Sequence, residues 1–261
     1  MVFRKHLLTL ALLVTHAQAA DWSDTEISVL KGKKYHDNSN GVDIEKTIVT
    51  FQHVSGYKYG RNFFFIDALK SDNKDNKYGE LYGEYYHTLS YSKITNKNWS
   101  QKFIRDIGLT GGINYGAKNS AFGPNPEIYL AGTTVDLNIP GFLFFNIDIL
   151  AHVDNSTYSG FGAGKSCGTN ATTYQVTPVW KLPFSLGSHK FSFEGFLDVI
   201  GKHGTCEKQI LTQPQIRWDI GNYFGQPDTI YLGVEYQYWK NKYGIDGREE
   251  SLPQALITWK L

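Results

Sequence analysis

Side chains alternate between apolar and polar along segment after segment of this chain. In residues 145–154, 210–220 and 230–239, almost every second side chain is apolar and most of those between are polar. Successive side chains of a β-strand point to opposite faces, so each segment predicts a strand with one apolar and one polar face. The fold class expected from this pattern is all-β.

Such segments recur along the whole chain after its first 20 residues. With a cleaved leader of 19 residues, 242 of the 261 residues remain, or about 20 for each of twelve strands with its connection. That spacing predicts one domain built as an antiparallel meander. The twelve predicted strands are centred near Val29, Thr50, Phe65, Tyr85, Leu109, Ala131, Ile149, Val176, Phe193, Gln215, Val234 and Ile257.

The predicted connections alternate in length along the chain. Four are short, at residues 57–60, 138–141, 183–187 and 221–227, and six are long and polar, at residues 31–45, 70–77, 116–126, 154–170, 202–208 and 240–250. Tight turns at one end and long loops at the other are typical of outer-membrane barrels. An even strand number places both termini at the end with the short turns.

Charged residues decide between a barrel in water and a barrel in a membrane. Many predicted polar faces carry a charge, and burying that many in a dry interior would be costly. Around a water-filled lumen they cost little, and the apolar faces are then left for lipid, with no free strand edge after closure. The sequence therefore predicts a twelve-stranded antiparallel transmembrane β-barrel, with a water-soluble β-sandwich as the alternative. The charges are Arg61, Asp67, Glu84, Asp106, Asp148, Lys181, Glu194, Asp198, Arg217 and Glu235.

Composition agrees with this choice. Lys and Arg number 26 against 25 Asp and Glu, which argues against a nucleic-acid partner. Aromatic residues make up 15% of the chain and suit strands and the two membrane interfaces. The candidates for interfacial girdles near strand ends are Tyr57, Tyr59, Trp99, Trp180, Trp218, Tyr223 and Trp259.

The N-terminus has the pattern of a secretory signal peptide. Arg4 and Lys5 precede an apolar run over residues 7–14, and Ala17-Gln18-Ala19 follows as a small-x-small exit. A membrane anchor is the alternative, but a spanning helix needs about 20 apolar residues. We expect a signal peptide at residues 1–19, the barrel domain at 20–261 and location in the cell outer membrane.

Cys167 and Cys206 are the two cysteines, and both lie in long polar connections at the same end of the predicted barrel. In an oxidising compartment such a pair predicts a disulfide. A metal site that adds His203 is the alternative, but structural zinc usually takes four ligands in paired spacings and no second pair is present. We expect neither a metal nor a cofactor.

Several longer motifs resemble the Tsx/OmpK family of nucleoside-specific outer-membrane channels. They include TIVTFQHVSGYKYG at residues 47–60, RNFFFID at 61–67, QPQIR at 213–217, GVEYQYWKNKYG at 233–244 and QALITW at 254–259. Taken in order they cover the mature chain. The resemblance implies a monomeric twelve-stranded barrel that passes nucleosides by diffusion, with outer loops that serve as receptors for phages and colicins.

The predicted third strand carries a candidate site for a nucleoside. If Arg61 and Asp67 face the lumen, then Phe63 and Phe65 do too. Two such rings could stack on a base, at about 1–3 kcal/mol per stack, while the charged groups bond the sugar hydroxyls. A shift by one residue would turn the two rings to lipid and bury Asn62, but it would also expose Arg61 and Asp67 to lipid at a depth-dependent penalty.

Further lumen candidates follow from the same alternation. Their mixed charges favour small neutral polar solutes over strong anions or cations. The alternative is that acid–base pairs only brace the barrel across its lumen. These candidates are Glu84, Tyr86, Glu194, Phe196, Asp198, Arg217, Tyr231, Glu235 and Trp239.

Two other functions stay open at this point. An outer-membrane lipase would need Ser and His aligned on one patch, but His87 and Ser90 face opposite sides, and His53 with Ser55 has no recognisable orienting motif. We therefore expect no enzyme. A surface receptor for phage or bacteriocin, with the barrel as an anchor, is supported by the six polar loops.

Overall fold

The computed structural model describes residues 20–36, 42–97, 100–120, 122–160, 164–168 and 170–261. The predicted signal peptide at 1–19 and the girdle candidate Trp99 lie outside the described residues. Among those described, the helices are too short and too polar to cross a membrane.

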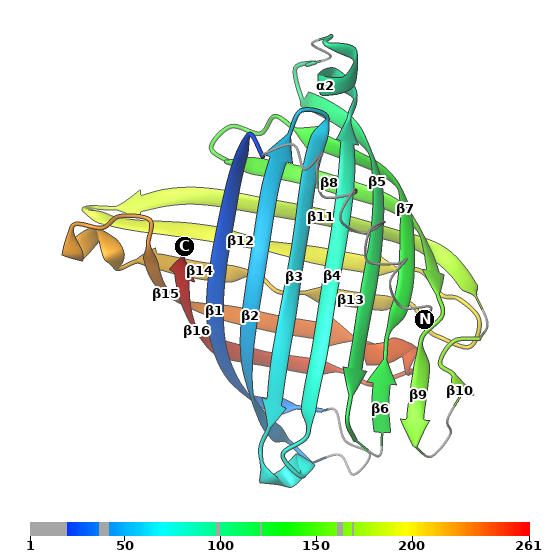
Figure 1. Cartoon of the computed structure of the whole chain (residues 1–261). Helices are drawn as coiled ribbons and strands as arrows, with labels where there is room; N and C mark the ends of the chain where they lie inside the picture. Colours follow the sequence, from blue (N-terminus) through cyan, green and yellow to red (C-terminus); the bar gives the residue numbers. More distant parts are fainter. Residues whose placement is uncertain (1–19, 37–41, 98–99, 121, 161–163, 169) are drawn as a thin grey trace, which may run out of the picture.

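The strands form a closed antiparallel barrel with twelve positions in its wall (Figure 1). Each position is called a stave here, because one of them is made of two strands, β13 and β14. Each stave pairs with its neighbours in sequence, and β1 pairs with β16 to close the ring. The predicted fold class is confirmed, and every predicted strand centre lies within a strand. The staves are β1 (Trp22–Tyr35), β2 (Ile44–Tyr57), β3 (Gly60–Ser71), β4 (Gly79–Ser90), β5 (Ile104–Lys118), β7 (Glu127–Leu137), β8 (Phe144–Asp154), β11 (Ala171–Leu186), β12 (His189–Ile200), β13 (Gln209–Thr212) with β14 (Gln215–Asp219), β15 (Ile230–Lys240) and β16 (Glu250–Lys260).

The tenth stave is interrupted, whereas the alternation over residues 210–220 predicted one continuous strand. Gln213 and Pro214 separate β13 from β14, because proline has no N–H to donate to the ladder. The pairing continues in the same register, from Thr212 opposite Tyr238 to Gln215 opposite Glu235. The break therefore leaves the two faces of the stave in phase.

The alternation sorts side chains between the outside and the lumen as predicted. On the outside, Leu81, Leu109 and Ile257 expose 59%, 67% and 45% of their area. Facing inward, Arg217 and Glu235 are almost completely buried. An apolar outer surface on a closed barrel is stable only in contact with lipid, so the chain is an outer-membrane β-barrel.

The inner wall is not polar throughout, which corrects the expectation that only polar faces line the lumen. Near the long loops, Leu30 and Ile48 pack with Leu252 and Leu256 inside the barrel. Tyr35 joins this cluster and donates a hydrogen bond to Gln254. These side chains pack on one another against the inner side of β1, β2 and β16, and the packing excludes water from this part of the barrel.

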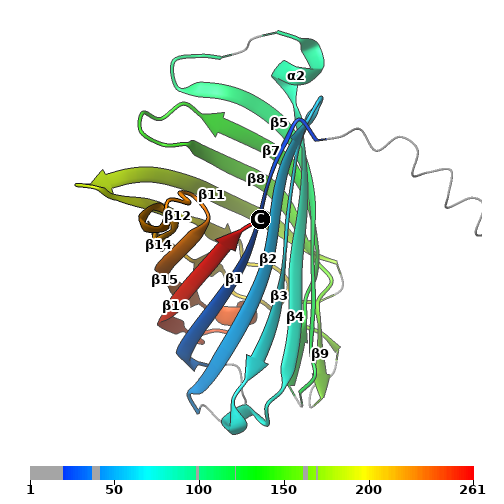
Figure 2. The ribbon, with the colours of Figure 1, turned by 60° about the vertical axis from the view of Figure 1, so that its left-hand side comes forward.

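The long connections lie at one end of the barrel, called here the loop end, and the short ones at the other, the turn end (Figures 1 and 2). Several predicted loops carry more structure than expected. β1 and β2 extend far into the predicted 31–45 loop, and β6 (Phe122–Asn125), β9 (Thr157–Gly160) and β10 (Gly164–Lys165) form a separate small sheet. Short 3-10 turns lie at η2 (Asn73–Asp75) and η4 (Lys242–Gly244).

One connection at the turn end departs from the predicted short turns. Residues 91–103 join β4 to β5 and contain the short helix α2 (Tyr91–Thr95), which lies above the barrel rim in Figure 2. Another short helix, η3 (Gly221–Phe224), lies in the β14–β15 connection. Trp218 and Tyr223 pack edge to face near it, at 5.6 Å between ring centroids, in the position expected of an interfacial girdle.

Candidate functional site

Four aromatic rings from two adjacent staves line one side of the lumen. Phe63 and Phe65 come from β3, and Tyr82 and Tyr86 from β4; these four residues are called the aromatic wall. Ring centroids lie 6.1 Å apart for Phe63–Phe65, 6.5 Å for Phe63–Tyr86 and 5.9 Å for Phe65–Tyr82. The rings therefore form a continuous patch along the barrel wall, at distances typical of packed aromatic pairs.

An ion pair establishes that this patch faces inward. The Arg61 guanidinium donates two hydrogen bonds to the Asp136 carboxylate, at 2.8 and 2.9 Å. Because β4 and β5 lie between these two residues, the pair runs across the inside of the curved wall. On the outer face Phe64 packs on Phe51 instead. The predicted phase of Arg61, Phe63, Phe65 and Asp67 is thus the observed one.

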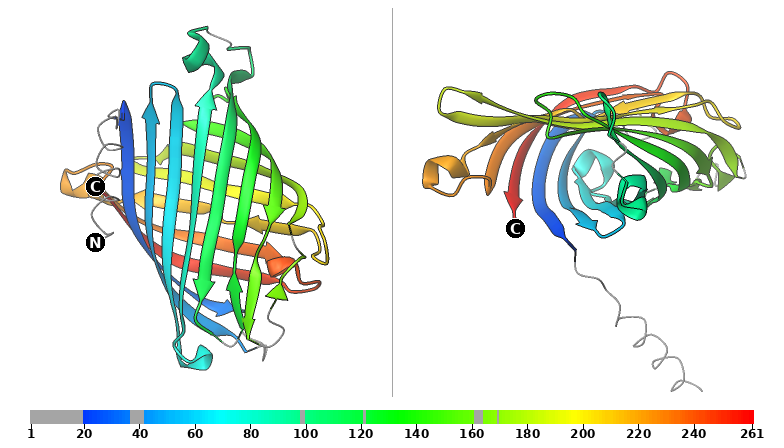
Figure 3. Two further views of the ribbon diagram at one scale, coloured as in Figure 1. Left: turned by 45° about the vertical axis from the view of Figure 1, so that its right-hand side comes forward. Right: turned by 90° about the horizontal axis from the view of Figure 1, so that it is seen from above.

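Opposite the aromatic wall, charged side chains form a bonded network. β12 and β14 stand about half a turn of the ring away from β3 and β4, as Figures 1 and 3 show. Arg217 donates to both carboxylate oxygens of Glu26, at 2.9 and 3.0 Å. Its Nε donates to Gln215 and lies 2.6 Å from a Glu194 oxygen, a contact that is ionic rather than a hydrogen bond. Lys181 contacts the other Glu194 oxygen at 2.9 Å. We call Glu26, Lys181, Glu194 and Arg217 the ionic wall.

Four other lumen carboxylates, those of Asp67, Glu84, Asp198 and Glu235, bond to uncharged groups. Asp67 accepts from Thr50 at 2.6 Å, Glu84 from Tyr82 at 2.5 Å and Asp198 from Thr177 at 2.5 Å. Glu235 likewise accepts from two glutamine side chains. Within the described residues none of these four carboxylates pairs with a cation. The lumen therefore holds charges of both signs, with the two arginines paired to carboxylates and these four carboxylates bonded to uncharged groups.

Two of the predicted lumen residues lie far from the aromatic wall along the barrel axis. Tyr231 is near the turn end, where its hydroxyl donates to Asp228. Trp239 is near the loop end, where its indole N–H donates to Gln209 at 3.3 Å and its ring packs edge to face on Tyr243. Both point inward, but the structure does not bring them to the same place as Phe63 and Phe65.

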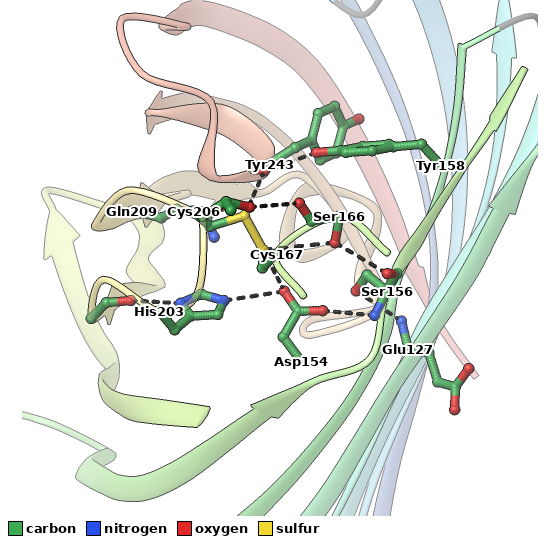
Figure 4. Close-up of a disulfide and its surroundings, with 12 residues drawn as sticks. Glu127, Asp154, Ser156, Tyr158, Ser166, Cys167, His203, Cys206, Gln209 and Tyr243 are labelled. Carbon is green, nitrogen blue, oxygen red and sulfur yellow. Dashed lines mark hydrogen bonds and ion pairs between the residues drawn. A yellow bond between two sulfur atoms is a disulfide. The ribbon is translucent and has the colours of Figure 1, made fainter. Parts of the chain in front are cut away.

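Three loops meet over the loop end of the barrel (Figure 4). The predicted disulfide is confirmed: Cys167 and Cys206 are joined, which ties the β8–β11 loop to the β12–β13 loop. Tyr158 donates to the Tyr243 carbonyl at 3.0 Å and so connects the β8–β11 loop to the β15–β16 loop. Burial raises the pKa of Tyr158 to about 12, so its phenol keeps the proton that it donates.

Ion pairs brace the inside of the barrel just below these loops. Lys46 contacts Glu80 at 3.1 Å, and Lys242 contacts Glu250 at 2.9 Å. All of them except Glu80 are almost fully buried. The loop end is therefore narrowed by packed side chains as well as by loops.

No family model matches the sequence. No curated protein matches it either. Among solved structures, the translocator domain of the autotransporter NalP from Neisseria meningitidis is similar, with 10% identity and a TM-score of 0.46, covering 97% of this chain and 93% of that one. The β domain of the Bordetella autotransporter BrkA is similar at 12% identity and a TM-score of 0.45, covering 92% and 99%. OmpF from Salmonella typhi, in complex with daunomycin, is similar at 7% identity and 0.35, covering 92% and 97%.

Sequence reasoning missed three residues that the lumen depends on. Tyr82 lies in phase with Glu84 and Tyr86 on β4, so the alternation alone could have found it. Glu26 and Asp136 also lie on polar faces, but their importance comes from partners three staves away. No local sequence pattern indicates such a partner, because the two residues of each pair are brought together by the curvature and closure of the barrel.

Proposed function

We propose that this protein is a passive outer-membrane channel, without enzymatic activity, for small polar solutes that carry an aromatic base, with nucleosides as the favoured class. The aromatic wall carries this proposal. It presents Phe63, Phe65, Tyr82 and Tyr86 as one patch on the inside of the barrel. Lipid-facing aromatic residues need no ligand to explain them, whereas a lumen-facing patch of this size is unusual on a wall in contact with water.

The groups beside the patch suit the rest of a nucleoside. A base can stack on successive rings, at about 1–3 kcal/mol per ring. Asp67 and Glu84 lie on the same faces of β3 and β4 and can accept hydrogen bonds from ribose hydroxyls. Stacking and hydroxyl recognition would then take place within one short stretch of the lumen.

The charge distribution adds a preference against anions. Arg61 and Arg217 are held by carboxylates, and four lumen carboxylates have only uncharged partners. Rings of carboxylates favour cations and repel anions in channels. A neutral nucleoside should therefore pass more readily than its phosphorylated form.

The test is nucleoside block of single-channel current in a planar bilayer. The double variant Phe63→Ala with Phe65→Ala should bind nucleosides at least about 30-fold more weakly, because it removes two stacking partners. The matched control is Phe51→Ala with Phe64→Ala, which removes two packed rings from the outer face of neighbouring staves. Equal block in the wild type and in the inner double variant would refute the proposal.

A second function, as a receptor for a phage or bacteriocin, is favoured by the joined loops. Cys167–Cys206 and the Tyr158–Tyr243 hydrogen bond hold three loops as one surface at the loop end. Deleting residues 156–169 and measuring solute flux and phage adsorption separately would distinguish the two roles. Loss of adsorption with flux retained would support the receptor; unchanged adsorption would exclude this loop.

A further inference from the structure

Two histidines and an aspartate converge inside the loop end of the barrel, beside the disulfide. His152 and Asp154 lie two residues apart on β8 and therefore point to the same, inner face. His203 reaches them from the β12–β13 loop, and Figure 4 shows its ring directed at Asp154. One ligand atom from each of the three residues lies within 4.8 Å of the other two.

His152 is held in the form that binds metal. Its Nδ1 lies 2.8 Å from the Gln175 side-chain oxygen. The Gln175 amide nitrogen donates to the Asp198 carboxylate, which can only accept, so the orientation of this amide is determined. Nδ1 of His152 must then be the donor, and its Nε2 carries a lone pair.

That lone pair has no partner. Only 1% of the His152 surface is exposed, and its Nε2 is a buried atom without a hydrogen bond in the described part of the chain. Leaving a buried nitrogen unpaired is destabilising, because the atom has lost its hydrogen bond to water and gained none. The His152 ring lies 5.4 Å from the His203 ring, centroid to centroid, so this unpaired nitrogen belongs to a side chain that sits beside a second imidazole and a carboxylate. An unpaired buried nitrogen in such a cluster points to a ligand that is bound there.

His203 and Asp154 are oriented in the same way by neighbouring groups. Nδ1 of His203 donates to the Gly201 carbonyl at 2.8 Å, which turns Nε2 toward Asp154 at 3.2 Å. The other Asp154 oxygen accepts from the Ser156 N–H at 2.7 Å. Hydrogen bonds from neighbouring groups, such as these, fix the tautomer of a metal-bound histidine and raise its basicity.

We propose that His152, Asp154 and His203 bind a divalent transition-metal ion of the zinc class, with water in a fourth, open position. Two imidazole nitrogens and a carboxylate oxygen are the donors that zinc prefers. Bond lengths of about 2.0–2.1 Å place tetrahedral ligand atoms about 3.3 Å apart. The His203–Asp154 distance of 3.2 Å already matches, and the ligand atom of His152 lies within 4.8 Å of the other two.

This site differs from the cysteine site weighed from the sequence. Both sulfurs of Cys167 and Cys206 are engaged in the disulfide and cannot act as thiolate ligands. His203 instead turns toward β8. The site lies close to the loop surface, because Lys202, Gly204 and Thr205 around His203 are exposed. A bound ion would fasten the β12–β13 loop to the barrel wall as a second link next to the disulfide.

The test uses the full barrel, refolded in detergent with its disulfide formed and purified without a polyhistidine tag. Cobalt(II) added to the metal-free protein should give the visible absorption of a tetrahedral site, and zinc should displace it at one equivalent. Zinc should also raise the unfolding temperature of the wild type. An absence of both effects would overturn the proposal.

Single variants test whether His152, Asp154 and His203 are the ligands of the metal ion. His152→Ala, His203→Ala and the nearly isosteric Asp154→Asn should each weaken zinc binding at least about 10-fold to 100-fold. Asp154→Asn keeps the side-chain shape and covers the case in which a histidine variant fails to fold. The control His189→Ala removes a histidine at the turn end and should leave the affinity within twofold. Unchanged affinity in Asp154→Asn and either folded histidine variant would overturn the assignment.

Discussion

The aromatic wall and the ionic wall face one lumen but are held in different ways. In the ionic wall, Arg217 is almost fully buried and bonds or contacts two carboxylates and an amide. In the aromatic wall, Phe63 and Phe65 are partly exposed and pack against each other and against Tyr86 and Tyr82. A buried charge that is bonded to its neighbours is turned away from a solute, whereas a partly exposed ring can still be reached by one.

The difference assigns opposite roles to two sets of residues that looked equivalent in the sequence. Arg217 and Glu194 brace the barrel, as the alternative interpretation of the lumen charges held. Under the proposed function, Phe63, Phe65 and the carboxylates beside them are the groups that meet the solute. Stability should therefore depend on the ionic wall and solute binding on the aromatic wall.

The strongest test of this division is Arg217→Met. The variant leaves the buried Glu26 without its cation and Glu194 with Lys181 alone, so the free energy of unfolding should fall by about 3–5 kcal/mol. Denaturant titration in detergent, followed by tryptophan fluorescence, measures it. Arg105→Met is the control, because Arg105 is exposed on β5 and its loss should change stability little. A decrease in the free energy of unfolding of less than about 1 kcal/mol would contradict the division of roles between the ionic wall and the aromatic wall.

Removing the disulfide should have the next largest effect. The bridge joins residues 39 apart in sequence, and the double variant Cys167→Ala with Cys206→Ala should lose between about 2 and 4 kcal/mol. The same titration measures it, and reduction of the wild type should reproduce the loss. Nucleoside block should be unchanged, since the bridge lies at the loop end. Altered block would mean that the loops, rather than the aromatic wall, determine solute binding.

A smaller effect is expected at Arg61, which borders the aromatic wall. Lysine keeps the charge but cannot form the two parallel hydrogen bonds to Asp136. Arg61→Lys should therefore cost about 1 kcal/mol of unfolding free energy, because this pair is more exposed than that of Arg217. A loss as large as that of Arg217→Met would show that the aromatic side of the lumen is braced as strongly as the other.

The smallest effect concerns His36, which lies outside the membrane at the loop end. Its hydrogen bond to the Glu249 carbonyl and its pairing with Asp43 raise the His36 pKa above 6.5. A raised pKa means that the extra stability is complete below pH 6.5 and is lost as pH rises through the higher folded value. His36→Gln should abolish this pH dependence, worth at most about 0.5 kcal/mol because the pair is exposed. Unfolding midpoints at several pH values measure it.

A good part of the fold was predictable because strand alternation is a local property. The twelve strand centres, the alternation of loop lengths and the inward phase of Phe63 and Phe65 all follow from it. The disulfide was predictable as well, because the chain has two cysteines and both fall at the same end. The break at Pro214 was visible in the sequence, but its effect on the ladder was overlooked.

The sequence by itself thus determined a membrane barrel and the face on which each side chain lies. Only the tertiary structure decided which charges are paired, since Arg217 meets Glu26 through closure of the ring at β1 and β16. It also decided that His152, Asp154 and His203 meet, because a loop 49 residues beyond Asp154 folds back onto β8. Alternation reports which side of a wall a residue faces, whereas barrel curvature and loop folding determine what stands opposite it.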